Sequence, residues 1–321
     1  MIGQIIGAAV LGTAAVGAAV FTGAAITLFN SVIPRQEKLR VDMSEFADMD
    51  TWEDYKKKIA PRAEWVYSQP LETVNVTARD GIRLNGYFLK AEGESKGAVI
   101  CHHGYTSKAL DNAAISVFFH DMGYDVLLVD NRAHGESEGK YVGFGILDRY
   151  DCLEWVKMMD ARYEGKKDIL LYGISMGATT VLMASSLSEL PKSVKAVISD
   201  CAFTSPYDVF SHILKRDYHL PKFPVMNIND AICRKKAGYG FQDYSTLDAV
   251  KSTTIPILFI HGKKDNFVPT WMSEKNYEEC TAPKDILMVE NAGHGASYYE
   301  NTDQYEAKIK EFLSKYVNSE K

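Results

Sequence analysis

The feature that most constrains how this chain of 321 residues can fold is a G-x-S-x-G pentapeptide at residues 173–177. A short apolar run, residues 168–172, precedes it, and a stretch rich in small residues, 176–186, follows it. This is the strand–turn–helix context in which a serine is presented above the edge of a sheet. Glycines on both sides leave room where the strand and the helix cross. The sequence therefore predicts Ser175 at a sharp, strained corner.

Two later segments supply an acid and a base in an order that suits this serine. Residues 255–262 are typical of a buried strand and precede Asp265, while residues 285–290 are typical of the next strand and precede His294. A serine hydroxyl is a poor nucleophile until a base takes its proton. A neutral imidazole does so near pH 7, and a carboxylate orients it. We predict Ser175, Asp265 and His294 as a catalytic triad, with Asp200 as an alternative acid.

An early apolar strand, residues 97–102, runs into a loop that contains Tyr105. In a strand–turn–helix site of this kind, one oxyanion donor is the N–H that follows the nucleophile, here that of Met176. The second donor comes from the loop after the early strand. We therefore expect the backbone N–H groups of Tyr105 and Met176 to form the oxyanion hole.

The alternation of elements predicts the fold class. Strand patterns at 97–102, 125–130, 168–173 and 194–200 alternate with helical patterns at 109–121, 145–161 and 176–187. Continuous apolar strands separated by helices indicate an α/β fold with a parallel sheet that is covered on both faces. Right-handed crossovers then give a mostly parallel, doubly wound sheet.

These segments resemble the α/β-hydrolase superfamily from about residue 70 to residue 318, and further matching stretches lie at residues 80–86, 103–105 and 130–137. The chain is similar to bacterial hydrolases described as serine aminopeptidase-like, many of which have a hydrophobic N-terminus. The resemblance implies about eight strands and a small cap insertion after strand 6, here residues 203–250, lying over Ser175. It also favours Asp265 over Asp200 as the acid. One departure is Ala133, where the family more often has glycine.

The predicted activity is that of a serine hydrolase. We expect it to cleave carboxylic esters with short to medium acyl groups through an acyl-enzyme intermediate. A small-molecule acyl ester or amide is the expected partner, and no cofactor is expected. A peptidase, amidase or acyltransferase that uses the same triad is the alternative, and a non-catalytic hydrolase-fold binding protein is a third possibility. The sequence gives no oligomeric state.

Charge and cysteine content exclude other classes. The net charge of −6 and the lack of a basic stripe argue against a nucleic-acid partner. The five cysteines are odd in number and well separated, so they do not indicate a disulfide framework. No C-x-x-C or H-x-x-x-H spacing occurs, and no metal is expected.

The N-terminus is the other distinctive segment. Residues 2–33 carry no charged side chain, and about 20 apolar residues suffice to cross a bilayer. We therefore predict a hydrophobic membrane segment at 1–34, a linker with short helices at 35–70 and the hydrolase domain at 71–321. The protein would be a single-pass membrane protein whose anchor takes no part in the chemistry. Basic residues that follow the segment favour a cytoplasmic catalytic domain, and an exported domain is the alternative.

Overall fold

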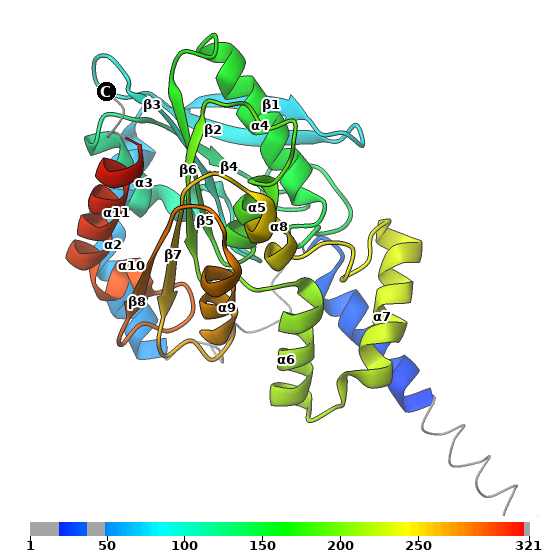
Figure 1. The fold of residues 1–321 in the computed structure, drawn as a ribbon. Coiled ribbons are helices and arrows are strands. Elements are labelled where there is room, and N and C mark those ends of the chain that lie inside the picture. Colours follow the sequence, from blue (N-terminus) through cyan, green and yellow to red (C-terminus); the bar gives the residue numbers. More distant parts are fainter. Residues whose placement is uncertain (1–18, 37–48, 318–321) are drawn as a thin grey trace, which may run out of the picture.

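An eight-stranded sheet runs through the centre of the molecule (Figure 1). The structure is a computed structural model that describes residues 19–36 and 49–317, with the side chains of 49–56 excepted. The strand order is β1-β2-β4-β3-β5-β6-β7-β8. Strand β2 pairs antiparallel with β1 and β4, and the other neighbours are parallel. The mostly parallel α/β-hydrolase sheet predicted from the sequence is confirmed.

The strands lie close to where the apolar runs predicted them. Their bounds are β1 Glu72–Thr77, β2 Arg83–Leu89, β3 Gly97–His102, β4 Asp125–Val129, β5 Asp168–Ile174, β6 Val194–Asp200, β7 Ile257–Gly262 and β8 Lys284–Val289. The helices are α2 Met49–Ser68, η2 Ala109–Asn112, α3 Ala113–Asp121, α4 Asp148–Arg162, α5 Met176–Ala184, α6 Pro206–Tyr218, α7 Lys222–Ala237, α8 Thr246–Ser252, α9 Trp271–Glu279, α10 Ser297–Glu300 and α11 Thr302–Tyr316. A further helix spans residues 19–32.

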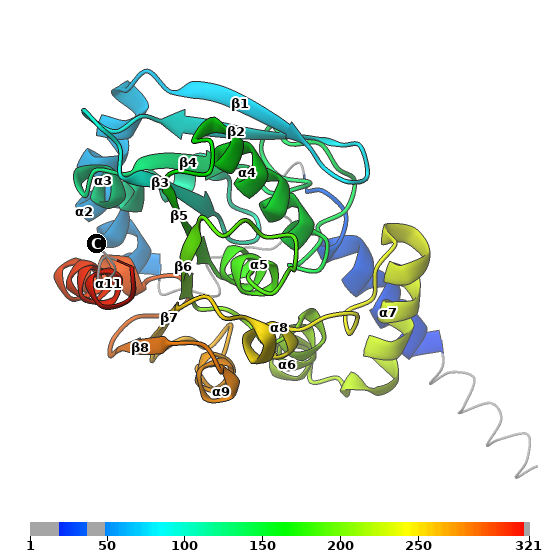
Figure 2. The ribbon, with the colours of Figure 1, turned by 45° about the horizontal axis from the view of Figure 1, so that its top comes forward.

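Helices cover both faces of the sheet, as Figure 2 shows. In β3, Val99 and Cys101 join a buried cluster with residues of α2, α3, α10 and α11. Their neighbours Ala98 and Ile100 join a second cluster with residues of α4, α5 and α8. Successive strand residues point to opposite faces, so a strand covered on both sides must be apolar throughout. This explains why the parallel strands appear as unbroken apolar runs in the sequence.

The N-terminal helix, residues 19–32, packs against the region 203–250 (Figures 1 and 2). A third buried cluster joins Ala25, Phe29 and Ile33 to side chains of α6 and α7. The amide of Asn229 in α7 donates to the backbone carbonyl of Ala25 over 3.3 Å. The face of this helix that carries Ala25 and Phe29 is therefore buried by the protein itself.

This packing corrects the predicted membrane location. Across the described ranges, 19–36 and 49–317, no helix combines the length and the apolar character that crossing a membrane requires. The single-pass membrane prediction is therefore wrong. The physical reason is that Phe29 and Ile33, only 2% and 1% exposed, contact protein rather than a bilayer. The first part of the predicted segment, residues 1–18, lies outside the described residues.

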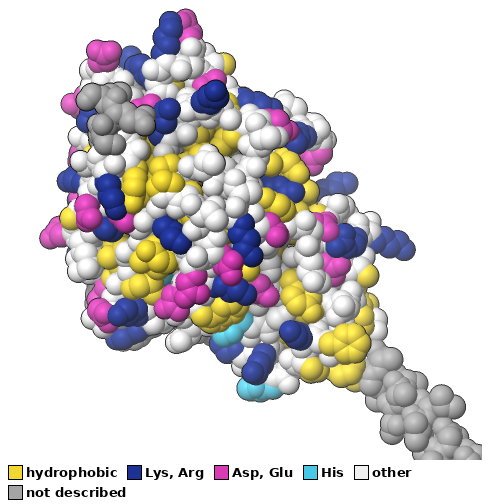
Figure 3. Space-filling model, viewed as in Figure 1, with side chains coloured by type: hydrophobic (Ala, Val, Ile, Leu, Met, Phe, Trp, Pro, Cys, Tyr) yellow, Lys and Arg dark blue, Asp and Glu magenta, His cyan; other side chains and the backbone are white. Residues whose placement is uncertain are grey.

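The surface of the same region retains some exposed hydrophobic side chains. Val20, Ile26 and Phe223 are exposed, and Figure 3 shows hydrophobic side chains gathered over the N-terminal helix and α7. Of the predicted linker, residues 37–48 lie outside the described residues. Residues 49–68 form one helix of 20 residues, which is longer than the short helices expected there.

Candidate active site

Ser175 occupies the corner between β5 and α5. Its backbone has φ 54° and ψ −114°, a conformation that side chains rarely adopt and that costs on the order of 1–3 kcal/mol. The Ser175 N–H donates to the carbonyl of Asp200 over 2.8 Å and fixes the corner to β6. A Cβ on Gly173 would lie 2.3 Å from the backbone of Gly177, and a Cβ on Gly177 would lie 2.2 Å from the carbonyl oxygen of His102. Both glycines are therefore required by close backbone approach.

His294 lies between Ser175 and Asp265. Its Nε2 is 2.9 Å from Ser175 Oγ, and its Nδ1 is 2.7 Å from Asp265 Oδ2. A carboxylate only accepts hydrogen bonds, so Nδ1 carries the proton and Nε2 is free to accept from the serine hydroxyl. This is the tautomer that a general base beside a serine requires. The structure thus brings together the three side chains that the sequence predicted as a triad.

Asp265 is held by more than His294. Its Oδ1 accepts from the backbone N–H groups of Phe267 and Val268 at 2.9 and 2.8 Å, and its Oδ2 lies 3.1 Å from His261 Nε2. Burial opposes the charged form, but the electrostatic interaction with His294 and the hydrogen bonds from both histidines outweigh it. The pKa of the Asp265 carboxyl is therefore held well below its usual range.

His261 is a further member of the site, and it was not among the site residues predicted from the sequence. Its Nε2 faces two acceptors, Asp265 Oδ2 and the carbonyl of Val268, so this nitrogen carries the proton. Its Nδ1 then accepts from the hydroxyl of Ser273 over 2.7 Å. His261 thereby anchors the acid loop to α9. The feature of the sequence that could have identified His261 is its position at the carboxyl end of β7, four residues before Asp265.

Asp200, the alternative acid, has different partners. Its side chain accepts from the hydroxyls of Ser297 and Tyr305, each over 3.1 Å. Burial raises the pKa of Asp200 to about 6. Asp265, rather than Asp200, makes the carboxylate hydrogen bond to His294.

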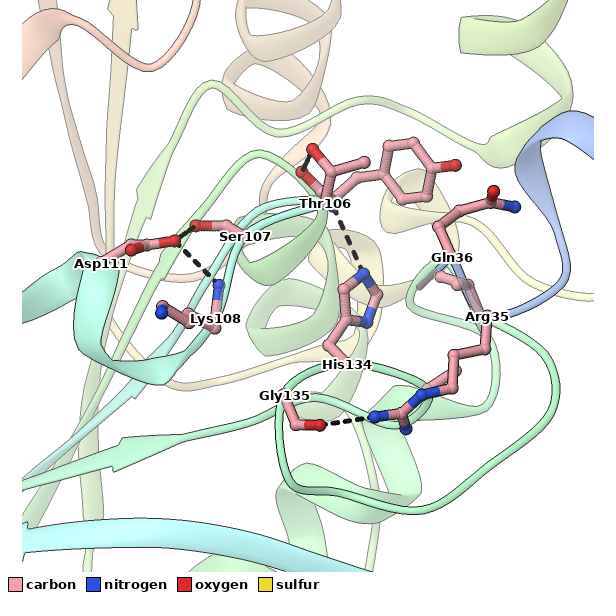
Figure 4. Close-up of a pocket in the computed structure, with 11 residues that line it drawn as sticks. Arg35, Gln36, Thr106, Ser107, Lys108, Asp111, His134 and Gly135 are labelled. Carbon is pink, nitrogen blue, oxygen red and sulfur yellow. Dashed lines mark hydrogen bonds between the residues drawn. The ribbon is translucent and has the colours of Figure 1, made fainter. Parts of the chain in front are cut away.

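The loop that contains Tyr105 lies beside Ser175. A Cβ placed on Gly104 would be 3.5 Å from the Cβ of Ser175. The Tyr105 hydroxyl donates to the carbonyl of Val32 over 3.0 Å, and the Thr106 N–H donates to His134 Nε2 over 3.3 Å (Figure 4). The loop is thus held on one side by the N-terminal segment and on the other by His134. Met176 directly follows Ser175 as the first residue of α5.

Arg35 secures the N-terminal segment to the same region. Its guanidinium donates to the carbonyls of Gly135 and Ser137, and the first of these bonds is drawn in Figure 4. The Val142 N–H donates to the carbonyl of Ile33 over 2.8 Å. Residues 19–36 therefore support the loop beside the nucleophile, a role that the sequence prediction did not include.

Buried histidines brace the base of this loop. His103 Nδ1 lies 2.7 Å from the carbonyl of Gly104, and its Nε2 accepts from the Asn131 N–H. His102 Nδ1 lies 2.7 Å from Asn131 Oδ1. Burial lowers the pKa of His102 and of His134 to about 4, so both are neutral at pH 7. They act as fixed hydrogen-bonding groups.

One group of possible metal ligands overlaps the triad. Within the described part of the chain, ligand atoms of Cys201, Asp265 and His294 lie within 4.8 Å of one another. Burial raises the pKa of the Cys201 thiol far above its usual value, and a metal binds the thiolate. Asp265 and His294 already bond each other. The donor set therefore favours the triad over a metal site.

A cavity of about 660 Å³ opens at Ser175 and His294. Its walls include Ile59, Ala63 and Tyr67 of α2, which sequence reasoning assigned to a linker. No residue between 203 and 250 is among those that line it. The resemblance implied that this region lies over Ser175, but several of its aromatic side chains are buried in the cluster that contains the N-terminal helix.

The fold and the arrangement at the carboxyl ends of β5, β7 and β8 define an α/β-hydrolase. The profile of the prolyl oligopeptidase family matches residues 112–320. The chain belongs to this family of hydrolases, which confirms the superfamily resemblance seen in the sequence.

Relatives and solved structures agree with this assignment. The chain is 30% identical to the Bacillus subtilis (strain 168) protein YqkD over 233 residues, which are 73% of this chain and 76% of that protein. It is 27% identical over 266 residues to the Homo sapiens alpha/beta hydrolase domain-containing protein 17C, covering 80% of this chain and 71% of that one. An esterase structure from Pyrococcus furiosus superposes with a TM-score of 0.65 at 22% identity, over 89% of this chain and 98% of the esterase.

Proposed function

We propose that the protein is a serine hydrolase that cleaves carboxylic esters. The observation that carries this proposal is the continuous hydrogen-bonded chain Ser175–His294–Asp265, with Ser175 opening onto a largely apolar cavity. In this proposal Ser175 is the nucleophile, His294 the general base and then the general acid, and Asp265 the group that fixes the tautomer of His294.

The reaction follows from this geometry in two halves. Ser175 Oγ attacks the ester carbonyl while its proton passes to His294 Nε2, 2.9 Å away. The resulting oxyanion accepts hydrogen bonds from the backbone N–H groups of Tyr105 and Met176, and loss of one such donor costs about 3 kcal/mol. His294 then gives the proton to the departing alcohol. Water repeats these steps on the acyl-enzyme and releases the acid.

Peptide or amide hydrolysis is the second candidate, and the matched family, named for prolyl oligopeptidases, favours it. The same triad can serve both reactions, so the cavity must discriminate between them. Its aliphatic and aromatic lining, including Ile59, Leu110 and Phe267, offers contact area for an apolar acyl group. This lining is why we place ester hydrolysis first.

A fluorophosphonate probe tests the nucleophile. The wild-type protein is expected to be labelled covalently, and Ser175→Ala is expected to abolish the labelling. Ser116→Ala, a buried serine in α3 away from the cavity lining, serves as the matched control. Labelling that persists in Ser175→Ala would refute the assignment. Turnover of p-nitrophenyl esters compared with aminoacyl amides then separates the two candidates.

A further inference from the structure

We propose that α2 is the specificity-determining wall of the site and selects an ester whose acyl group is apolar and of medium length. This inference rests on the proposed ester hydrolysis and adds the substrate class. Helix α2 supplies Ile59, Ala63 and Tyr67 to the cavity that contains Ser175. All three lie more than 100 positions before the nucleophile in the sequence.

Helix α2 is fixed firmly enough to act as a wall. Val66 is fully buried in the cluster shared with α3 and α11. On another side of the helix, Arg62 forms an ion pair with Glu306 of α11, with 2.5 Å between Nη1 and Oε1. Lys58 Nζ donates to the carbonyl of Tyr299 over 3.0 Å. These contacts hold α2 to the C-terminal helices, and Ala63 lines the cavity.

The position of α2 points to the acyl group rather than the alcohol. Helix α2 packs on α3, and the Tyr67 hydroxyl reaches the carbonyl of Leu110, 3.4 Å away, in the segment that follows Tyr105. The departing alcohol must receive its proton from His294, so it leaves on the histidine side. The acyl group stays bound to Ser175, and the Tyr67 end of α2, which reaches Leu110, forms the wall of the cavity on the side of the Tyr105 loop.

The cavity has room for an acyl group of moderate size. Its volume of about 660 Å³ lies within the range of roughly 300–1,000 Å³ that is typical of pockets for small molecules. Each methylene buried there is expected to raise kcat/KM about fourfold until the cavity is filled. The region 203–250 contributes no lining residue, so its aromatic side chains are not expected to set this preference.

The test measures kcat/KM for p-nitrophenyl esters from acetate to decanoate in the full-length protein. The substitution Ala63→Phe fills part of the cavity and is expected to lower the octanoate-to-acetate ratio at least tenfold. The matched control is Ala231→Phe, at an exposed alanine of α7 outside the cavity lining, and it should leave the ratio unchanged. Tyr67→Ala removes an exposed ring at the cavity and should lower the ratio at least threefold. This second variant decides the matter if Ala63→Phe fails to fold.

Three outcomes would overturn the proposal. The first is an unchanged ratio in both α2 variants, and the second is a shift in Ala231→Phe of the same size. The third concerns a parallel series of acetate esters whose alcohols increase in length. If the α2 variants change the dependence of kcat/KM on alcohol length instead of acyl length, α2 binds the alcohol. Every variant is also tested for fluorophosphonate labelling. If the proposed hydrolase function is wrong, the wild type itself is not labelled. If only the role of α2 is wrong, the wild type and the variants are labelled alike.

Discussion

The N-terminal helix is expected to be part of the folded unit, and Phe29→Ala tests this directly. Phe29 is 2% exposed and belongs to the buried cluster shared with α6 and α7. Its ring lies 6.0 Å from that of Tyr141, and the ammonium group of Lys236 lies 5.2 Å from the ring centre. Truncation of this side chain leaves a cavity between the helix and the region 203–250.

The expected loss is large compared with the stability of a folded domain. Replacing a buried phenylalanine by alanine costs about 3–5 kcal/mol, because transfer free energy and cavity formation add. Native proteins are stable by only about 5–15 kcal/mol. Since the Tyr105 hydroxyl bonds to Val32 in the same segment, a loosened helix should also disturb the loop beside Ser175. Deletion of residues 1–36 should therefore impair ester hydrolysis, contrary to the anchor role expected from the sequence.

The assay is urea unfolding followed by tryptophan fluorescence, with ester turnover measured in parallel. Val20→Ala is the matched control because Val20 lies on the same helix and is 56% exposed. Its effect should stay within about 0.5 kcal/mol, as is usual for surface substitutions. Equal unfolding free energies for Phe29→Ala and Val20→Ala would refute the packing argument. So would a deletion of residues 1–36 with full stability and activity.

Two further predictions concern the carboxylates near His294. Asp265→Asn should lower kcat by roughly 10⁴, because an amide no longer enforces the Nδ1–H tautomer of His294. Asp200→Asn should lower kcat much less. Steady-state kinetics that show the reverse ranking would mean that Asp200 is the acid. The second prediction is a pH dependence of stability. The native pKa of Asp200 is raised to about 6 by burial, so the native state keeps this proton where the unfolded chain, with a pKa of about 3.9, has released it. The wild type should therefore lose on the order of 3 kcal/mol relative to Asp200→Asn as pH rises from about 4 through 6, and urea unfolding that shows no such trend would contradict the assignment.

The central sheet and the side chains of the proposed triad could be predicted from the sequence because both leave local signals. Parallel strands covered on two faces are continuous apolar runs. The proposed catalytic groups follow such runs directly, as Ser175 follows β5 and His294 follows β8. The φ of 60° at Ala133 lies in the region that favours glycine, which accounts for the glycine that the family more often has at this position.

The N-terminal helix could not be placed in this way. An uncharged run rich in Ala, Gly, Ile and Val satisfies the requirement of a bilayer and of a protein interior equally well, because both bury apolar surface. What decides between them is a partner surface, here formed by α6 and α7 together with residues 133–147. That surface is assembled only in the tertiary structure, so the apolar pattern was consistent with the burial of Ala25, Phe29 and Ile33 but could not show that protein, rather than a bilayer, buries them.

The division of the site between two parts of the chain limits what relatives can reveal about substrate. Ser175, Asp265 and His294 lie within residues 112–320, which match the family profile, whereas Tyr105 and the cavity residues of α2 lie outside it. Chemistry that depends on the first group can be common to the family. In our proposal, selection of the acyl group depends on the second, where a single buried methylene changes binding by about 0.8 kcal/mol. Two proteins of this family with superposable triads can therefore prefer different substrates, and the residues that line each cavity determine that preference.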